Sequence, residues 1–203
     1  MRTIEEIRKT ARILVIDDSA FPFKSQFEKD GYHIERWATI KNLSQLTDGH
    51  YHVILLDIHG VGLNVDPDRQ GIGVLAHIKE TNPAQPVLVY SAKPHGVRAI
   101  DQLKLADGVL DKSQAYVDYK SSIDRILTAR STPEAYIAMV NAYLGADVAR
   151  APKLVPRVLK AIQTGRVDRL AKYLNRALHE PTQIDRVLAI VSIGVTTVGL
   201  FQG

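Results

Sequence analysis

Short apolar runs alternate with stretches of helical periodicity through the first two thirds of the chain. Continuous apolar runs lie at residues 13–16, 53–56, 87–90 and 108–110, and an alternating segment lies at 33–37. Continuous apolar runs are typical of strands buried on both faces of a parallel sheet. The intervening stretches of roughly 10–15 residues predict crossover helices, for example at 19–30, 72–80, 97–105 and 114–129. The pattern therefore predicts an α/β domain, a doubly wound five-stranded parallel sheet with helices on both faces.

The alternation ends near residues 129–133, and the remaining sequence has helical periodicity only. Pro133 suits the first position of a new helix, and Thr132 suits its N-cap. Further apolar positions at helical spacing lie at 135–144, 156–162 and 167–178. We therefore predict two domains, an α/β domain at 1–130 and a smaller all-α domain at 131–203.

Residues 187–201 form an apolar tail of fifteen residues without a charge. A membrane-spanning helix needs about 20 apolar residues, whereas runs of 10–14 are more often buried helices. Our first interpretation of this tail is a core helix of the second domain. The alternative is a short segment that inserts into a membrane or self-associates, because small residues at 192, 194, 196 and 199 allow close helix contacts.

Composition narrows the classes of protein that fit. Apolar residues make up 45% of the 203 positions and the net charge is only +4, which excludes global disorder. The chain has no cysteine, which excludes disulfides, thiolate metal sites and a cysteine nucleophile. Residues 1–12 are charged and lack the apolar run of a secretory signal, so we expect a cytoplasmic protein.

The positive charge is concentrated in the C-terminal third. Residues 130–203 hold ten Lys and Arg against five Asp and Glu, and the basic surface candidates are Arg157, Lys160, Arg166, Arg169, Lys172 and Arg176. A solvated helix face is the ordinary explanation, and binding of phosphates on lipid or nucleic acid is the alternative. Because the apolar tail follows, a membrane surface fits these cations better than a DNA groove. Sequence-specific DNA binding ranks last, since the tail lacks base-reading side chains.

Polar residues stand where the predicted strands end. Asp17 and Asp18 follow the first strand, Asp57 the third and Ser91 the fourth, while Lys112 follows the fifth. The carboxyl ends of parallel strands meet at one edge of the sheet, so these groups should converge. Clustered carboxylates favour the binding of Mg²⁺. A metal ion beside a carboxylate is suited to phosphoryl transfer to aspartate.

Four motifs in this order, ILVIDD, VILLDIHG, VYSAK and ADGVLDKS, resemble the receiver domain of two-component response regulators across residues 11–129. The resemblance implies a CheY-like fold and a cytoplasmic signalling protein that a histidine kinase or phosphotransfer protein phosphorylates on Asp57. It implies Mg²⁺ held by Asp18, by Asp17 through water, by Asp57 and by the backbone carbonyl of His59. It also implies that Ser91 and Lys112 bind the phosphoryl oxygens.

Three features depart from that family. The loop at 58–70 is longer than usual, Val109 replaces the aromatic switch residue, and Ser113 replaces the usual proline after the lysine. Our first hypothesis is a phosphorylated response regulator, not an enzyme in its own right, with output by protein or membrane contact through the helical domain. The alternative is an unphosphorylated scaffold with the receiver fold that forms homo-oligomers or attaches to a membrane. A DNA-binding regulator ranks third, below both.

Overall fold

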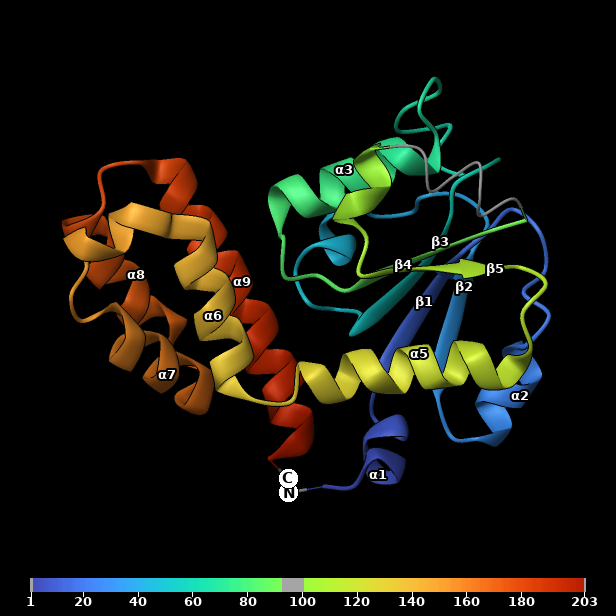
Figure 1. Ribbon diagram of the computed structural model, residues 1–203, viewed down its shortest axis with the longest axis horizontal. Coiled ribbons are helices and arrows are strands. Elements are labelled where there is room, and N and C mark those ends of the chain that lie inside the picture. The colour runs from blue at the N-terminus through green and yellow to red at the C-terminus, as the bar shows by residue number, and fades with distance from the viewer. Residues whose placement is uncertain (1, 93–100, 203) are drawn as a thin grey trace.

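The computed structural model describes residues 2–92 and 101–202, and Figure 1 shows an α/β unit beside a helical unit. One sheet of five parallel strands has the order β2-β1-β3-β4-β5. The strands are β1 (Arg12–Ile16), β2 (His33–Trp37), β3 (Val53–Asp57), β4 (Val87–Ser91) and β5 (Gly108–Asp111). The predicted five-stranded parallel sheet is confirmed.

Two apolar layers cover the sheet. Side chains of α1 (Ile4–Arg8), α2 (Lys24–Lys29) and α5 (Tyr116–Ala129) share one core with alternate residues of the strands. The other strand residues pack with α3 (Gly71–Thr81) and with the short 3-10 helices η1 (Ser44–Leu46) and η2 (Asp101–Leu105). Figure 1 shows α3 and α5 on opposite sides of the sheet. The unit is therefore doubly wound, as predicted.

Some helix boundaries differ from the predictions. The helix expected at 19–30 begins only at Lys24, because Pro22 disfavours helical geometry in the residue before it. Of the helix expected at 97–105, residues 97–100 lie outside the described residues, and 101–105 form the 3-10 helix η2. The sequence analysis missed α1, which has a capping box formed by Thr3 and Glu6.

The C-terminal unit is all-α, as predicted, and its helices form a bundle. It contains α6 (Pro133–Leu144), the 3-10 helix η3 (Gly145–Arg150), α7 (Leu154–Thr164), α8 (Val167–Ala177) and α9 (Pro181–Phe201). Helix α9 packs against α6, α7 and α8 at the centre of the bundle. Gly194 makes the close approach possible, since a Cβ atom there would lie 2.9 Å from Cγ of Tyr136.

The apolar tail is part of α9. By length and composition alone this helix could cross a membrane, yet 56% of its most apolar 18-residue window is buried inside the protein. Val187, Ile190 and Val191 are fully enclosed by the neighbouring helices. The structure thus places 187–201 where the core-helix interpretation expects it, and the membrane alternative is supported by length and composition alone.

The last turn of α9 reaches back to the α/β unit. Leu200 and Phe201 belong to the same buried cluster as Ile7 of α1. The backbone N–H of Arg2 donates to the carbonyl of Phe201 at 3.2 Å. Asn82 Nδ2, at the end of α3, donates to the carbonyl of Ala189 at 3.0 Å. The two units therefore share one helix. The division of the chain into two domains at 130/131 stays a prediction.

Candidate functional site

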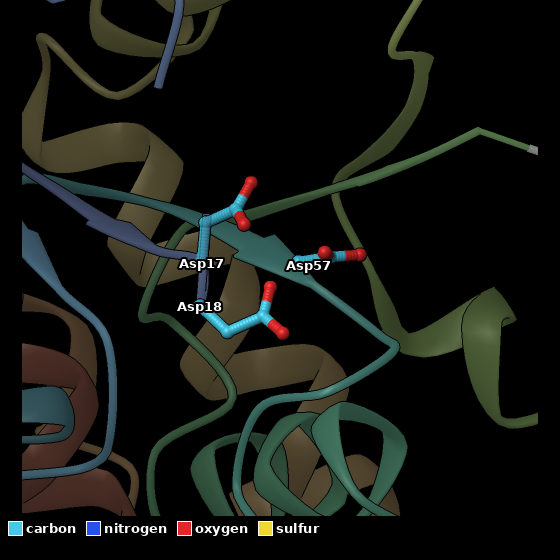
Figure 2. A group of neighbouring side chains, drawn as sticks. All are labelled: Asp17, Asp18 and Asp57. Atoms are coloured by element: carbon cyan, nitrogen blue, oxygen red, sulfur yellow. The ribbon is translucent and has the colours of Figure 1, made fainter. Parts of the chain in front are cut away.

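Three carboxylates lie together at the carboxyl edge of the sheet. Asp17 follows β1, Asp18 is its neighbour, and Asp57 ends β3. One carboxylate oxygen from each lies within 4.8 Å of the others, and Figure 2 shows the three side chains around a common space. Asp17 and Asp57 are buried, whereas Asp18 is exposed. The convergence expected from the strand ends is present.

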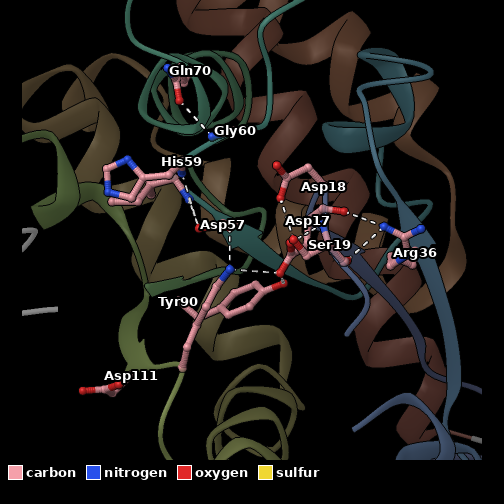
Figure 3. A network of polar contacts seen from close by, with 12 residues as sticks. Asp17, Asp18, Ser19, Arg36, Asp57, His59, Gly60, Gln70, Tyr90 and Asp111 are labelled. Carbon is pink, nitrogen blue, oxygen red and sulfur yellow. Dashed lines mark hydrogen bonds and ion pairs between the residues drawn. The ribbon is translucent and has the colours of Figure 1, made fainter. Parts of the chain in front are cut away.

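Lys112 closes this group from the end of β5. Its Nζ lies 2.6 Å from Oδ2 of Asp57 and 3.1 Å from Oδ2 of Asp17. Figure 3 shows the polar contacts around Asp17, Asp57 and Tyr90. Burial by itself lowers the pKa of Lys112, but the hydrogen bonds to Asp57 and Asp17 outweigh it and raise the pKa above its ordinary value. The ammonium is therefore held in its charged form beside the candidate phosphoacceptor.

The Asp57 side chain is fixed by two backbone N–H groups that follow it in the chain. Its Oδ1 accepts the N–H of Ile58 at 2.7 Å and of His59 at 3.3 Å. The first residue of α3, Gly71, lies against the Asp57 carbonyl so closely that a Cβ atom would overlap it. Helix α3 thus packs directly on the backbone that carries the candidate phosphoacceptor. The expected role of the His59 carbonyl stays a prediction.

Asp17 has a hydroxyl partner that the sequence analysis missed. The hydroxyl of Tyr90 donates to Oδ2 of Asp17 at 2.6 Å, and the N–H of Ser19 donates to Oδ1 at 2.8 Å. Burial raises the pKa of Asp17, but these hydrogen bonds and Lys112 outweigh it, and the pKa lies below its ordinary value. The signal for this contact in the sequence was Tyr90 itself, which follows three aliphatic residues in β4.

A second missed residue, Arg36, braces the turn after β1. Its Nη1 donates to the carbonyl of Asp17 at 2.7 Å and of Ser19 at 3.0 Å. Arg36 belongs to β2, which pairs with β1 along its whole length. This contact fixes the backbone from which the Asp17 and Asp18 side chains extend.

The long loop at 58–70 is tied to the same edge. The N–H of Gly60 donates to Oε1 of Gln70 at 2.9 Å. Gly60 has a φ of +75°, and a Cβ atom there would overlap the Asp18 carboxylate. Glycine is therefore required at this position by both the backbone conformation and the space that Asp18 occupies.

The remaining predicted phosphoryl ligand, Ser91, ends β4 and is fully buried. Its carbonyl accepts the N–H of Lys112 at 3.0 Å, so the two predicted phosphoryl ligands are linked through the backbone. The aromatic switch position holds Val109, which pairs with Val89 in the sheet and is half-buried. The structure thus places Asp17, Asp18, Asp57, Ser91 and Lys112 at one edge.

Carboxylate oxygens are the ligands that Mg²⁺ prefers, and one or two direct carboxylates suffice because this ion keeps several waters. The three oxygen atoms within 4.8 Å of one another therefore fit a divalent cation of this type. Within residues 2–92 and 101–202 this is the one group of three such side chains that could hold a metal.

The sheet order 2-1-3-4-5 is that of the flavodoxin-like and CheY-like folds. Asp57 ends the central strand of that sheet, with the acidic pair on one side and Lys112 on the other. The strand order therefore gives the α/β unit the CheY-like fold.

Comparison with solved structures gives matches to response regulators at low sequence identity. A CheY-like receiver domain protein from Methanospirillum hungatei JF-1 is 22% identical, covers 58% of this chain and 97% of its own, and has a TM-score of 0.45. Full-length FixJ from B. japonicum is 19% identical, covers 96% of this chain and 97% of its own, and has a TM-score of 0.48. A Burkholderia pseudomallei response regulator with a phosphorylated aspartic acid, a calcium ion and citrate is 17% identical over 84% of this chain and 99% of its own, with a TM-score of 0.45.

No protein-family model matches the sequence, and no curated protein matches it.

The six predicted basic surface residues lie on or beside α7 and α8, in the helical unit and away from the carboxyl edge of the sheet (Figure 1). They therefore form a separate surface from the carboxylate site.

Proposed function

We propose that this chain is a signalling protein of the response-regulator type, phosphorylated on Asp57 in a Mg²⁺-dependent reaction. A histidine kinase or phosphotransfer protein is the natural donor, and the helical unit provides output by contact with a protein partner. The observation that supports this proposal is the cluster of Asp17, Asp18 and Asp57 oxygens within 4.8 Å, with Lys112 bonded to Asp57.

The chemistry follows from the groups at the edge. An Asp57 carboxylate oxygen attacks phosphorus, the bond from phosphorus to the donor breaks, and the donor leaves with that electron pair. The Asp18 and Asp57 carboxylates would hold Mg²⁺, which would supply positive charge to neutralise the phosphoryl oxygens. Lys112 exchanges its contact with Asp57 for a phosphoryl oxygen, and the Ser91 hydroxyl donates to another. The domain thus assists its own phosphorylation without acting on a separate substrate.

A route from this edge into the helical unit starts at β5. Asp107, just before β5, binds Nζ of Lys79 from α3 at 2.6 Å and Nη2 of Arg130 at 2.8 Å. Arg130 follows α5 and also contacts Sδ of Met139 in α6. A shift of β5 with Lys112 would therefore move groups that contact α6, and we propose this cluster as the coupling element.

The test is phosphorylation by a small phosphodonor. We expect purified protein with Mg²⁺ and acetyl phosphate to gain the mass of one phosphoryl group, and the gain to be lost with EDTA. Asp57→Asn should abolish the gain. Asp101→Asn is the matched control, because Asp101 is exposed and pairs with Lys104 on the surface. Equal gain in wild type and Asp57→Asn would contradict the proposal.

A second candidate function is a scaffold that works without phosphorylation. Val109 in place of the aromatic switch residue favours it. This candidate expects no mass gain in the wild type, together with self-association through the helical unit. Size-exclusion chromatography at increasing protein concentration measures that association.

A further inference from the structure

Six cations form one surface on the helical unit. Arg157 and Lys160 belong to α7, Arg166 lies at the turn, and α8 supplies Arg169, Lys172 and Arg176. We call these six residues the basic track. All six are exposed, and no ion pair to any of them occurs within residues 2–92 and 101–202.

Two adjoining clefts run along the basic track. One of about 150 Å³ is lined by Arg157, Lys160, Arg166 and Arg169, together with Ala161, Thr164 and Leu170. The other, of about 240 Å³, is lined by Arg157, Arg169, Lys172, Tyr173 and Arg176. No carboxylate lines either cleft, and both share Arg157 and Arg169. The two clefts therefore adjoin at these two arginines, and clefts lined by one sign of charge concentrate field lines and attract anions.

The track is partly organised before any ligand arrives. The guanidinium carbon of Arg157 lies 4.5 Å from the ring centroid of Tyr173, so α7 and α8 are joined across the clefts. The hydroxyl of Tyr173 accepts the N–H of Lys153 at 3.1 Å, which fixes the ring. Gly165 makes the tight turn between the helices with a φ of +70°. Arg157 is therefore held at the point that both clefts share.

We propose that the basic track binds the sugar–phosphate backbone of duplex nucleic acid without reading its sequence. From Arg166 to Arg176 the rise along α8 is about 15 Å, which matches about four base-pair steps along the axis of a duplex. A single compact anion would use only part of this track, whereas a row of phosphates uses all of it. Four of the six cations are arginines, whose planar guanidinium groups bind phosphate oxygens through paired hydrogen bonds.

The structure favours nucleic acid over a membrane surface. The apolar helix that a membrane anchor would use, α9, is enclosed by α6, α7 and α8. Among the described large apolar residues of α7 and α8, only Val155 is exposed, so the basic track lacks apolar side chains that could enter a bilayer.

The test measures binding of the full chain to a fluorescent 30-base-pair DNA duplex of random sequence. With about six phosphate contacts, log affinity should fall against log salt with a slope of about −5. Lys160→Glu/Arg169→Glu should weaken binding at least tenfold and reduce the slope by about two. The matched control is Lys29→Glu/Arg125→Glu, which makes the same charge change at exposed positions of the α/β unit. Circular dichroism verifies that both variants fold.

The control variant should bind DNA nearly as well as the wild type. Equal weakening by both double variants would overturn the proposal, because net charge and not the track would then control binding. Absence of DNA binding at low salt would overturn it as well. So would binding to vesicles rich in phosphatidylserine, without binding to DNA, if Lys160→Glu/Arg169→Glu abolished it.

Discussion

At the scale of single residues, Asp17, Tyr90 and Lys112 form one hydrogen-bonded unit around a buried carboxylate. Tyr90 donates to the same oxygen that Lys112 contacts, and the Lys112 ammonium lies 5.0 Å from the Tyr90 ring centroid. Burial first, and then the contact with Asp17, raise the pKa of Tyr90, so its hydroxyl stays protonated and keeps donating. Tyr90 therefore acts as a permanent donor beside the candidate metal site.

Tyr90→Phe removes this donor while keeping the ring. Because a buried hydrogen bond to a charged group contributes about 1.5–3 kcal/mol, we expect the free energy of unfolding to fall by about 2 kcal/mol. Urea denaturation at neutral pH measures the loss. The matched control is Tyr116→Phe, whose hydroxyl bonds Asp30 at the exposed surface and should cost much less. Equal losses would contradict the role assigned to Tyr90.

His52 gives a pH dependence of stability. Burial, helped by the charge of Arg12, lowers the pKa of His52 to about 4, and its Nδ1 accepts the N–H of Arg12. The unfolded chain has an ordinary histidine pKa of about 6.5, so it binds more protons than the folded state between these values. Stability should therefore fall by about 3 kcal/mol as the pH drops from about 6.5 to 4.

Denaturation curves at pH 7, 5.5 and 4.5 measure this slope. His52→Asn keeps an acceptor for the Arg12 N–H but does not titrate, so its stability should vary less across the window. The low pKa of Asp17 acts in a different range, below the ordinary aspartate value of about 3.9. An unchanged slope in His52→Asn would assign the pH dependence to other groups.

At the scale of helices and strands, much of the α/β unit could be predicted because its signals are local. Continuous apolar runs predicted the buried strands. The ends of those strands predicted that Asp17, Asp57 and Lys112 lie at one edge of the sheet. The contact of Tyr90 with Asp17 could not be predicted, because it depends on how the Tyr90 side chain packs across β3, which lies between β1 and β4 in the sheet. The clefts of the basic track depend on how α7 and α8 pack, which periodicity does not determine.

Two glycines on α9 should respond oppositely to the same substitution. A Cβ atom at Gly194 would lie 2.9 Å from Tyr136 and 3.1 Å from Ile162, so Gly194→Ala should destabilise the bundle by about 1–2 kcal/mol. Gly199 has nothing within 4 Å of that position, and Gly199→Ala should stabilise the helix by about 0.5–1 kcal/mol. Thermal unfolding followed by circular dichroism compares the two. A change in stability of the same sign in both variants would contradict the packing described for α9.

At the scale of the whole molecule, α9 belongs to two cores. Its middle packs with α6, α7 and α8, and its end packs with α1 and α5 of the α/β unit. The contacts of Asn82 with Ala189 and of Arg2 with Phe201 add hydrogen bonds along the same boundary. A substitution that weakens the packing at the end of α9 should therefore lower the stability of the α/β unit.

Phe201→Ala tests this coupling. Phe201 is buried in the α/β core, and loss of a buried phenylalanine costs about 3 kcal/mol or more. Trp37, the one tryptophan of the chain, lies buried in β2 and reports on the sheet. We expect the midpoint of the Trp37 fluorescence transition to fall in Phe201→Ala. Leu63→Ala, at an exposed loop position, should leave it unchanged. An unchanged midpoint in Phe201→Ala would show that the stability of the sheet does not depend on the end of α9.

The end of α9 also limits how freely the two units can come apart. Pulling Leu200 and Phe201 out of the α/β core would expose both side chains to water, at a cost of about 3–6 kcal/mol. At equilibrium such an opened form would be present in about one molecule in two hundred to one in twenty-five thousand. A signal passing between the units therefore travels through small shifts of packed helices, unless a partner captures that rare opened form.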